Sequence, residues 1–167
     1  LKGRPALPSA LRGILQRYPR SYLLSLGVAL CFFTSMNILV APLPLYVTHL
    51  GGSAVAVGLA AGLFTGFALL SRAPVGWLAD RVHRWWLLLA GCGICLAASL
   101  AYVTVHTVPA VLVIRAFHGM GAAVFTTGYT ALAADLAPAD RRGEVLGLAG
   151  IASPIALFFA PALGDWV

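Results

Sequence analysis

Five long apolar runs, almost free of charged side chains, constrain this chain more than any other feature of its sequence. They span residues 22–47, 54–78, 85–106, 109–134 and 143–166. An α-helix needs roughly 20 apolar residues to cross the hydrocarbon core of a bilayer, and every run is long enough. A membrane-spanning strand is about half that length and alternates in hydrophobicity, which these runs do not. We therefore predict an all-α membrane protein, a bundle of five transmembrane helices.

The charge content supports a membrane environment and argues against several other classes of protein. Only 10% of the 167 residues are charged, whereas a soluble domain carries about a quarter. The net charge of +6 comes from basic residues scattered between the apolar runs, so we expect a lipid bilayer and no nucleic acid as a partner. Cys92 and Cys95 match C-x-x-C but lie inside an apolar run, where we expect small packing residues rather than a zinc or redox site. The four histidines show no metal-binding spacing, and we expect neither a metal ion nor a cofactor.

The basic residues predict which way the helices cross the membrane. Ten of the eleven fall on one side of the predicted bundle: Lys2, Arg4, Arg12, Arg17 and Arg20 before the first run, Arg72, Arg81 and Arg84 at or after the end of the second, and Arg141 and Arg142 between the fourth and fifth. Cytoplasmic segments are enriched in Lys and Arg. We therefore predict a multi-pass protein of the plasma (cytoplasmic) membrane. Residues 1–20 form its basic cytoplasmic N-terminal segment, and residues 21–167 carry the helices.

An odd number of spans and a first residue other than Met lead us to expect a fragment of a longer protein. The sequence also contains a weak internal similarity between two of the apolar runs. The second and fifth runs open on "VGLAAG" (57–62) and "LGLAGI" (146–151), and "APVG" and "APALG" stand near their ends. In the predicted topology these helices run in opposite directions, as in the inverted repeats of secondary transporters. Small residues recur in any membrane helix, so the alternative is that this similarity arose by chance.

Arg115 is the most informative single residue, because it lies well inside the fourth run. A guanidinium at membrane depth usually faces the interior of a bundle or a water-filled path. The alternative is a side chain that reaches out to the interface. His118 follows at i+3 on the same face, and Gly119 and Gly121 leave space beside them. We interpret Arg115 as part of a polar cavity, and His118 as a residue that either lines it or packs.

Asn37 and a row of glycines are further candidates inside the apolar runs. Asn37 lies in the first run, ahead of Pro42 and Pro44, and an amide in lipid finds a partner on another helix or in a cavity. Pathway lining and helix packing are equally compatible with it. The glycines Gly58, Gly62 and Gly66 lie on one face of the second helix, which predicts a close contact with another helix.

The remaining charges gather in two loops on the predicted cytoplasmic side. Asp80, Arg81 and Arg84 follow the second run, and Asp135 and Arg142 flank the linker before the fifth. Each cluster alone is compatible with a solvated turn. Together they suggest a shared network of ion pairs. Exposed pairs are worth only about 0–1 kcal/mol each, which suits a contact that holds one of two conformations better than one that supplies stability.

Four patterns, in order along the chain, resemble those of the major facilitator superfamily of secondary transporters. Gly76, Asp80, Arg81 and Arg84 match its G-x-x-x-D-[RK]-x-G-[RK]-[RK] loop, with His83 and Trp85 as departures. Arg115, Gly119 and Gly121 match its R-x-x-x-G-x-G helix pattern, and Asp135 and Arg142 match its acid and arginine six residues apart. Pro161 and Gly164 match the end of its antiporter pattern, in which alanines here replace most of the glycines. The resemblance covers about residues 20–167.

The resemblance implies a twelve-helix fold in two halves, each built from inverted three-helix repeats, of which this chain holds the first five helices. It implies alternating access to a small-molecule site between the halves. Asp80 and its neighbours would form a cytoplasmic gate, and Arg115 would lie on the proton or substrate path.

From these features we predict secondary active transport of a small organic solute, with proton-coupled efflux as the expected direction. Arg115, His118 and Asn37 would line the pathway, and the missing C-terminal half would be a partner. A non-transporting scaffold or sensor with the same fold is the alternative. An intramembrane enzyme is less favoured. It needs a nucleophile–base pair or paired acids at membrane depth, whereas the acids here lie in loops or, for Asp165, near the end, and no Gly-x-Ser-x-Gly occurs.

Overall fold

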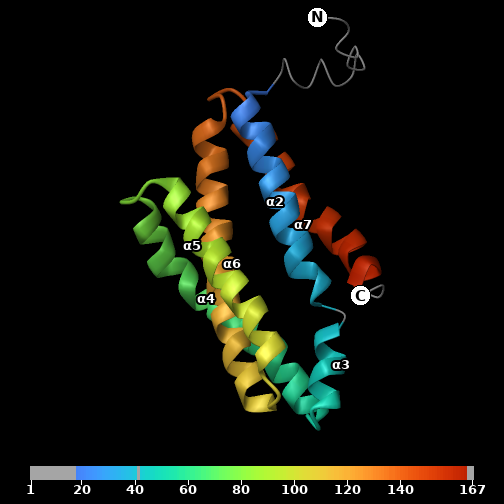
Figure 1. Cartoon of the computed structure of the whole chain (residues 1–167). Coiled ribbons are helices and arrows are strands. Elements are labelled where there is room, and N and C mark those ends of the chain that lie inside the picture. Colours follow the sequence, from blue (N-terminus) through green and yellow to red (C-terminus); the bar gives the residue numbers. More distant parts are fainter. Residues whose placement is uncertain (1–17, 41, 165–167) are drawn as a thin grey trace, which may run out of the picture.

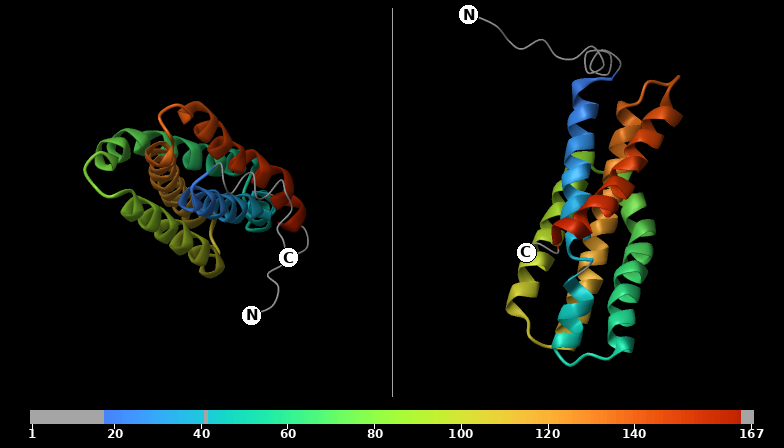
Figure 2. Two further views of the ribbon diagram at one scale, coloured as in Figure 1. Left: turned by 90° about the horizontal axis from the view of Figure 1, so that it is seen from above. Right: turned by 90° about the vertical axis from the view of Figure 1, so that its right-hand side faces the viewer.

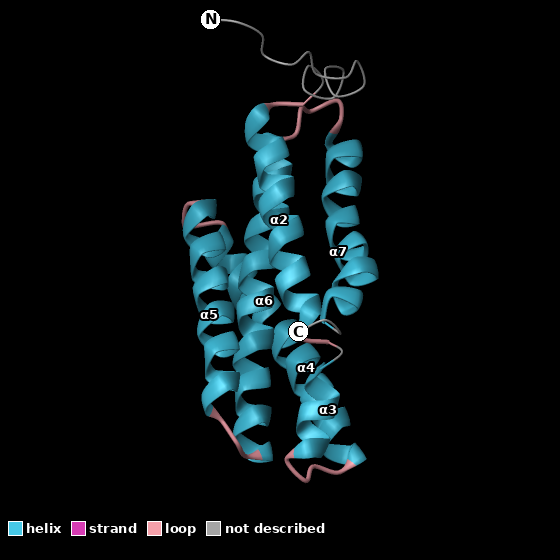
Figure 3. Ribbon diagram, turned by 45° about the vertical axis from the view of Figure 1, so that its right-hand side comes forward, coloured by secondary structure: helices cyan, strands magenta, loops and turns pink. Residues whose placement is uncertain are grey.

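The computed structural model describes residues 18–40 and 42–164, with side chains as far as residue 159. This part of the chain consists of helices joined by short turns and contains no strand (Figures 1 and 3). The helices are α2 (Arg20–Ile38), α3 (Pro42–His49), α4 (Ala54–Ala79), α5 (Arg84–Thr104), α6 (Val108–Leu136) and α7 (Arg142–Gly164). Lys2, Arg4, Arg12 and Arg17, and with them most of the predicted N-terminal segment, lie outside the described residues.

The prediction of five membrane-spanning helices is confirmed. Five segments of the described chain are long and apolar enough to cross a bilayer: Arg20–His49, Ala54–Ala79, Arg84–Thr104, Val108–Leu136 and Arg142–Phe159. The helices α4 to α7 begin and end within about two residues of the predicted apolar runs. The boundaries agree because a helix in lipid extends until polar residues can reach water.

The first span differs from the prediction, which gave a single helix over residues 22–47. The structure divides it into α2 and α3, with a turn in which the Val40 N–H donates to the Asn37 carbonyl over 3.0 Å. The physical reason is the pair of prolines that follows. Pro42 and Pro44 have no N–H to donate, and a proline ring clashes with the carbonyl four residues earlier. The helix therefore stops before Pro42 and restarts there.

Apart from the turn at residues 39–40, the described turns lie at two ends of the bundle (Figure 1). The charged end holds the start of α2, the α4–α5 turn and the α6–α7 turn. The uncharged end holds the α3–α4 turn (50–53) and the α5–α6 turn (105–107), which contain no Lys, Arg, Asp or Glu. The exposed side chains of Trp77, Trp85 and Trp86 cluster near the charged end, where tryptophans commonly mark the membrane interface. Successive spans therefore run in opposite directions, as the predicted topology requires.

Helix α6 lies at the centre of the fold, and glycines allow its close approach to both neighbours. It packs along α4 on one side and along α5 on the other. A Cβ atom added at Gly119 would lie 2.1 Å from the carbonyl oxygen of Phe64 on α4. Conversely, a Cβ added at Gly91 of α5 would lie 2.5 Å from the backbone nitrogen of Phe125 on α6. Backbone against backbone is the usual way in which small residues hold membrane helices together.

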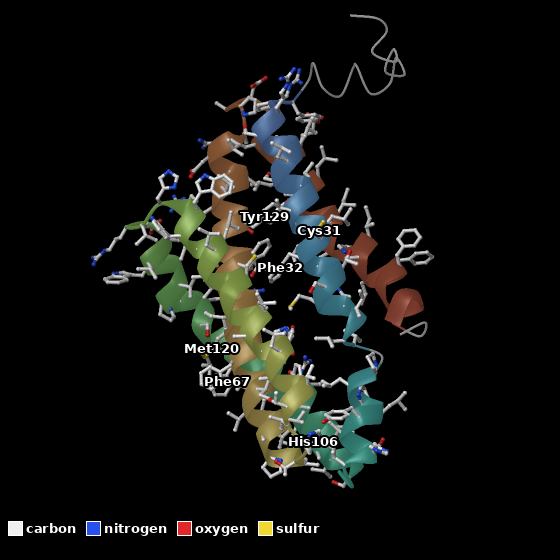
Figure 4. All side chains as sticks on the ribbon, viewed as in Figure 1. Cys31, Phe32, Phe67, His106, Met120 and Tyr129 are labelled. Carbon is white, nitrogen blue, oxygen red and sulfur yellow. The ribbon has the colours of Figure 1, made fainter. Side chains whose placement is uncertain are left out.

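Helices α2 and α7 form a second packed pair beside this group (Figure 2). The Tyr22 hydroxyl of α2 donates a hydrogen bond of 2.7 Å to the Val145 carbonyl of α7. The ring of Phe32 on α2 stacks on that of Phe125 on α6, with centroids 3.6 Å apart, and Tyr129 continues the stack (Figure 4). This aromatic stack joins the α2–α7 pair to the three central helices.

The contacts between helices fit the predicted inverted repeat. Spans one to three would correspond to spans four to six, with the second and fifth running in opposite directions. Exchanging first with fourth and second with fifth converts the α4–α6 contact into the α7–α2 contact. Both contacts are present, and α4 and α7 do run in opposite directions (Figure 1).

The glycine face of α4 does not form the close contact that its spacing predicts. At Gly58, Gly62 and Gly66 an added Cβ atom would have nothing within 4 Å among the described residues. The reason is the rotation of α4, whose Ala60 and Phe64 face α6 instead. Pro161 and Gly164, the other predicted packing residues, belong to the last turns of α7, where side chains lie outside the described residues.

The two glycines of α5 provide a test of this packing. We expect Gly91→Ala to destabilise the complete protein by about 1–3 kcal/mol, because its Cβ would collide with the Phe125 backbone. Gly93→Ala is the matched control, since nothing lies within 4 Å of the added atom. Thermal unfolding in detergent should show a loss for the first variant alone. Equal behaviour of the two would contradict the close approach of α5 and α6.

Candidate functional site

Arg115 is held against α4, about two turns into α6 from the uncharged end. Its Nε donates to the Ala60 carbonyl oxygen over 3.4 Å. Its guanidinium carbon lies 4.4 Å from the centre of the Phe64 ring, within the range of a cation–π contact. Gly119, one turn further along α6, lets Phe64 come this close. The same glycine contact that packs the helices therefore positions the charge.

A small cavity lies beside the guanidinium. It has a volume of about 170 Å³ and is enclosed by α3, α4 and the turn before α3. Val40, Leu43 and Pro44 form one wall, and Ala60 and Ala61 another, with Val47 and Val57 completing the lining. Among the described residues, Arg115 is the one charged side chain that lines it. The polar cavity predicted around Arg115 thus has a single polar wall.

His118 follows Arg115 at i+3 on the same side of α6 but does not line this cavity. Its side chain is 1% exposed. The His118 Nδ1 lies 3.5 Å from the hydroxyl oxygen of Tyr102 on α5, whereas its Nε2 has no hydrogen-bond partner among the described residues. The Phe64 ring, which faces the Arg115 guanidinium, also lies edge-to-face against the His118 ring, with centroids 5.8 Å apart. Phe64 therefore links two residues that we had expected to share a cavity directly.

Asn37 makes its hydrogen bond within its own helix. Its side-chain nitrogen donates to the Phe33 carbonyl oxygen over 2.7 Å. It does not line the cavity beside Arg115. The amide is therefore satisfied near the end of α2, one turn before the break in the first span. The structure brings neither Asn37 nor His118 into the Arg115 cavity.

At the charged end, two predicted gate residues form an ion pair between helices. The Arg84 Nε lies 2.9 Å from the Asp135 Oδ2, which joins the start of α5 to the last turn of α6. The two side chains are 24% and 54% exposed, so water screens the pair.

The other charges at this end form separate contacts rather than one network. The Arg81 guanidinium carbon lies 3.7 Å above the Trp77 ring centre. Arg141 pairs with the neighbouring Asp140 over 3.6 Å, and Tyr18 donates to Glu144. Asp80, the residue after α4, and Arg142 are exposed and make no ion pair within the described chain. Among the described residues, the pair of Arg84 and Asp135 is therefore the ion pair that joins the two predicted clusters.

A groove of about 660 Å³ runs between α4 and α6 at the charged end. Arg72, Gly76 and Asp80 line it from α4, and Thr126 and Thr130 line it from α6. Both threonine hydroxyls donate to carbonyls of their own helix. Two of the predicted gate residues, Gly76 and Asp80, thus face the same groove.

Sequence reasoning missed several polar contacts that shape the site. Tyr102 lies in an uncharged run, and a hydroxyl at that depth could have been noted as needing a partner. Tyr46 of α3 donates to the Val105 carbonyl and so joins the first span to the α5–α6 turn. The Ala60 carbonyl and the Phe64 ring carry no sequence signal, because any residue at those positions would look like another apolar helix residue.

The fold and its buried polar residues define a multi-pass integral membrane protein with a charged group at membrane depth. The Major Facilitator Superfamily profile matches residues 24–167, so the chain belongs to this family. It is 29% identical over 126 residues to the uncharacterized MFS-type transporter MJ1560 of Methanocaldococcus jannaschii, covering 75% of this chain and 33% of that protein. It is 21% identical over 135 residues to the quinolone resistance protein NorA of Staphylococcus aureus, covering 81% and 35%. The chain therefore spans about a third of the length of these relatives.

A double-mutant cycle can measure the coupling free energy of the Arg84–Asp135 ion pair. We expect Arg84→Ala, Asp135→Ala and the double variant to give a coupling free energy below about 1 kcal/mol, because the pair is exposed. The coupling should decrease further as salt is raised. Unfolding of the complete protein in mixed micelles measures it. A coupling above about 2 kcal/mol that is insensitive to salt would show that the pair is a structural element.

Proposed function

We propose that this chain is the N-terminal part of a secondary transporter that moves a small organic solute by alternating access, as a proton-coupled exporter. Membership of the family and similarity to a quinolone resistance protein support this proposal. The second half of the site would come from further helices of the same protein. The exposed glycine face of α4 (Gly58, Gly62 and Gly66) is suited to a close contact with one of them.

The observation that carries the proposal is the placement of Arg115. A guanidinium at membrane depth is unfavourable by at least about 2.5 kcal/mol and is found mainly where it lines a pathway. Here it is held by a long hydrogen bond and an aromatic face, next to a cavity. A purely structural arginine would be expected to have a carboxylate partner. Arg115 is therefore our candidate for the pathway, with His118 beside it against the same Phe64 ring rather than in the cavity.

The charged end supplies the proposed gate. Asp80 stands at the rim of the α4–α6 groove with no ion-pair partner in the described chain. It is therefore available to a partner in the second half of the protein. The exposed Arg84–Asp135 pair holds α5 and α6 together only weakly. Weak contacts at this end allow two conformations of similar free energy, which alternating access requires.

The orientation follows from the same charges, and we propose that the charged end faces the cytoplasm. It can be tested with single cysteines in a complete protein that has no other cysteine. A membrane-impermeant maleimide added to intact cells should label His106→Cys, in the exposed α5–α6 turn (Figure 4), without permeabilisation. It should label Asp140→Cys only after the cells are opened. The reverse pattern would invert the topology.

Transport by the complete protein in proteoliposomes tests both the function and the gate, with a quinolone as the first solute. We expect solute-dependent proton flux from the wild-type protein. Asp80→Asn should slow it about tenfold while insertion into the membrane is unchanged, because the gate contact loses its charge. Asp140→Asn is the matched control, since Asp140 pairs only with its neighbour Arg141. Wild-type flux from the Asp80 variant would remove Asp80 from the gate. An absence of flux with a broad panel of solutes would favour a scaffold or sensor.

A further inference from the structure

The charge of Arg115 has no counter-charge in the described chain. The protein contains five acidic residues. Four of them belong to the charged end, namely Asp80, Asp135, Asp140 and Glu144, whereas Arg115 lies about two turns from the uncharged end. The fifth, Asp165, lies outside the described residues. A charge removed from water without an opposite charge is strongly unfavourable, so the surroundings of Arg115 favour the arrival of an anion.

The contacts that Arg115 does make are all to neutral groups. The Ala60 carbonyl accepts from Nε over 3.4 Å, a long distance for such a bond. The Phe64 ring offers its face, with the guanidinium carbon 4.4 Å from the ring centre. A guanidinium carries five N–H donors in a planar fork, and neutral acceptors such as these leave its charge in place.

The cavity beside the guanidinium has the size and lining for a small organic anion. Its volume of about 170 Å³ corresponds to roughly six water molecules of about 30 Å³ each. Apart from Arg115 its lining is apolar, and Val40, Leu43 and Pro44 form part of it. A carboxylate matches the guanidinium fork and accepts two parallel hydrogen bonds. Its hydrocarbon part would then lie against the apolar wall.

We propose that this cavity binds the carboxylate group of an organic anion, paired with Arg115. The binding site itself needs only the described helices α3, α4 and α6. That the bound carboxylate belongs to the transported solute rests on the proposed function. The alternative partner of the guanidinium is a group of the protein itself, the Asp165 carboxylate.

Benzoate and benzamide are suitable probes, because they share a ring and differ in the charge of the head group. The complete protein in lipid nanodiscs would be titrated with each at constant ionic strength, and thermal unfolding recorded. Benzoate should raise the unfolding temperature of the wild-type protein with a saturable midpoint, and benzamide should not. The midpoint should increase at least about tenfold in Arg115→Gln, and less in Arg115→Lys, which keeps the charge without the fork. Arg20→Gln, at an exposed arginine of the charged end, should leave it unchanged.

Three results would overturn the proposal. The first is equal stabilisation by benzoate and benzamide, which needs no variant and so does not depend on how the Arg115 variants fold. The second is an unchanged benzoate midpoint in both Arg115 variants. The third is binding of benzoate to Asp165→Asn but not to the wild-type protein, which would identify Asp165 as the internal counter-charge. Benzoate binding at a similar midpoint in wild-type and Asp165→Asn supports the proposal.

The same preparations separate this inference from the proposed function. Saturable benzoate binding without proton-coupled flux of any solute would keep the carboxylate site and reject the exporter. Proton-coupled flux of neutral solutes without benzoate binding would keep the exporter and reject the site.

Discussion

In hydrocarbon a backbone N–H or C=O group has no water to bond with, so each membrane-spanning segment must satisfy its own backbone. This requirement turns every long apolar run of the sequence into a helix. It leaves the arrangement of the helices to be decided by other forces, since lipid is as apolar as the leucine and valine side chains themselves. Close packing at small residues then largely determines how the helices are arranged, and the glycine contacts of α6 are the clearest case.

Helix α6 shows how one element can serve both packing and chemistry. Gly119 brings the Phe64 backbone of α4 into contact, and Gly91 of α5 brings α5 onto Phe125. Because these contacts fix how α6 is rotated, they also fix where Arg115 and His118 point. Both contact Phe64 of α4; Arg115 also borders the cavity, whereas His118 also approaches Tyr102 on α5. The chemistry of the site is thus a consequence of how closely the three helices pack.

The sequence was sufficient to predict the number of spans, their limits and their alternation in direction, because these depend on where the apolar runs begin and end. It also identified Arg115, since a charge inside an apolar run stands out. It did not predict that α2 ends before Pro42, because a proline in a membrane helix is compatible with either a bend or a break. The sequence did not predict the contact partners of the polar residues. Arg84 meets Asp135, and Arg115 meets Ala60 and Phe64, only because helices distant in sequence pair with a particular rotation.

The division of the first span has a consequence for hydration. Pro42 and Pro44 stand four residues after Ile38 and Val40, so the carbonyl oxygens of Ile38 and Val40 lose their usual helical donors. They do so at a depth where lipid offers no replacement, and Val40 also lines the cavity beside Arg115. These two oxygens and the guanidinium favour water at the same level of the membrane. We therefore expect water beside the carbonyl oxygens of Ile38 and Val40. It would form a hydrated layer within a span that is otherwise surrounded by lipid and apolar side chains.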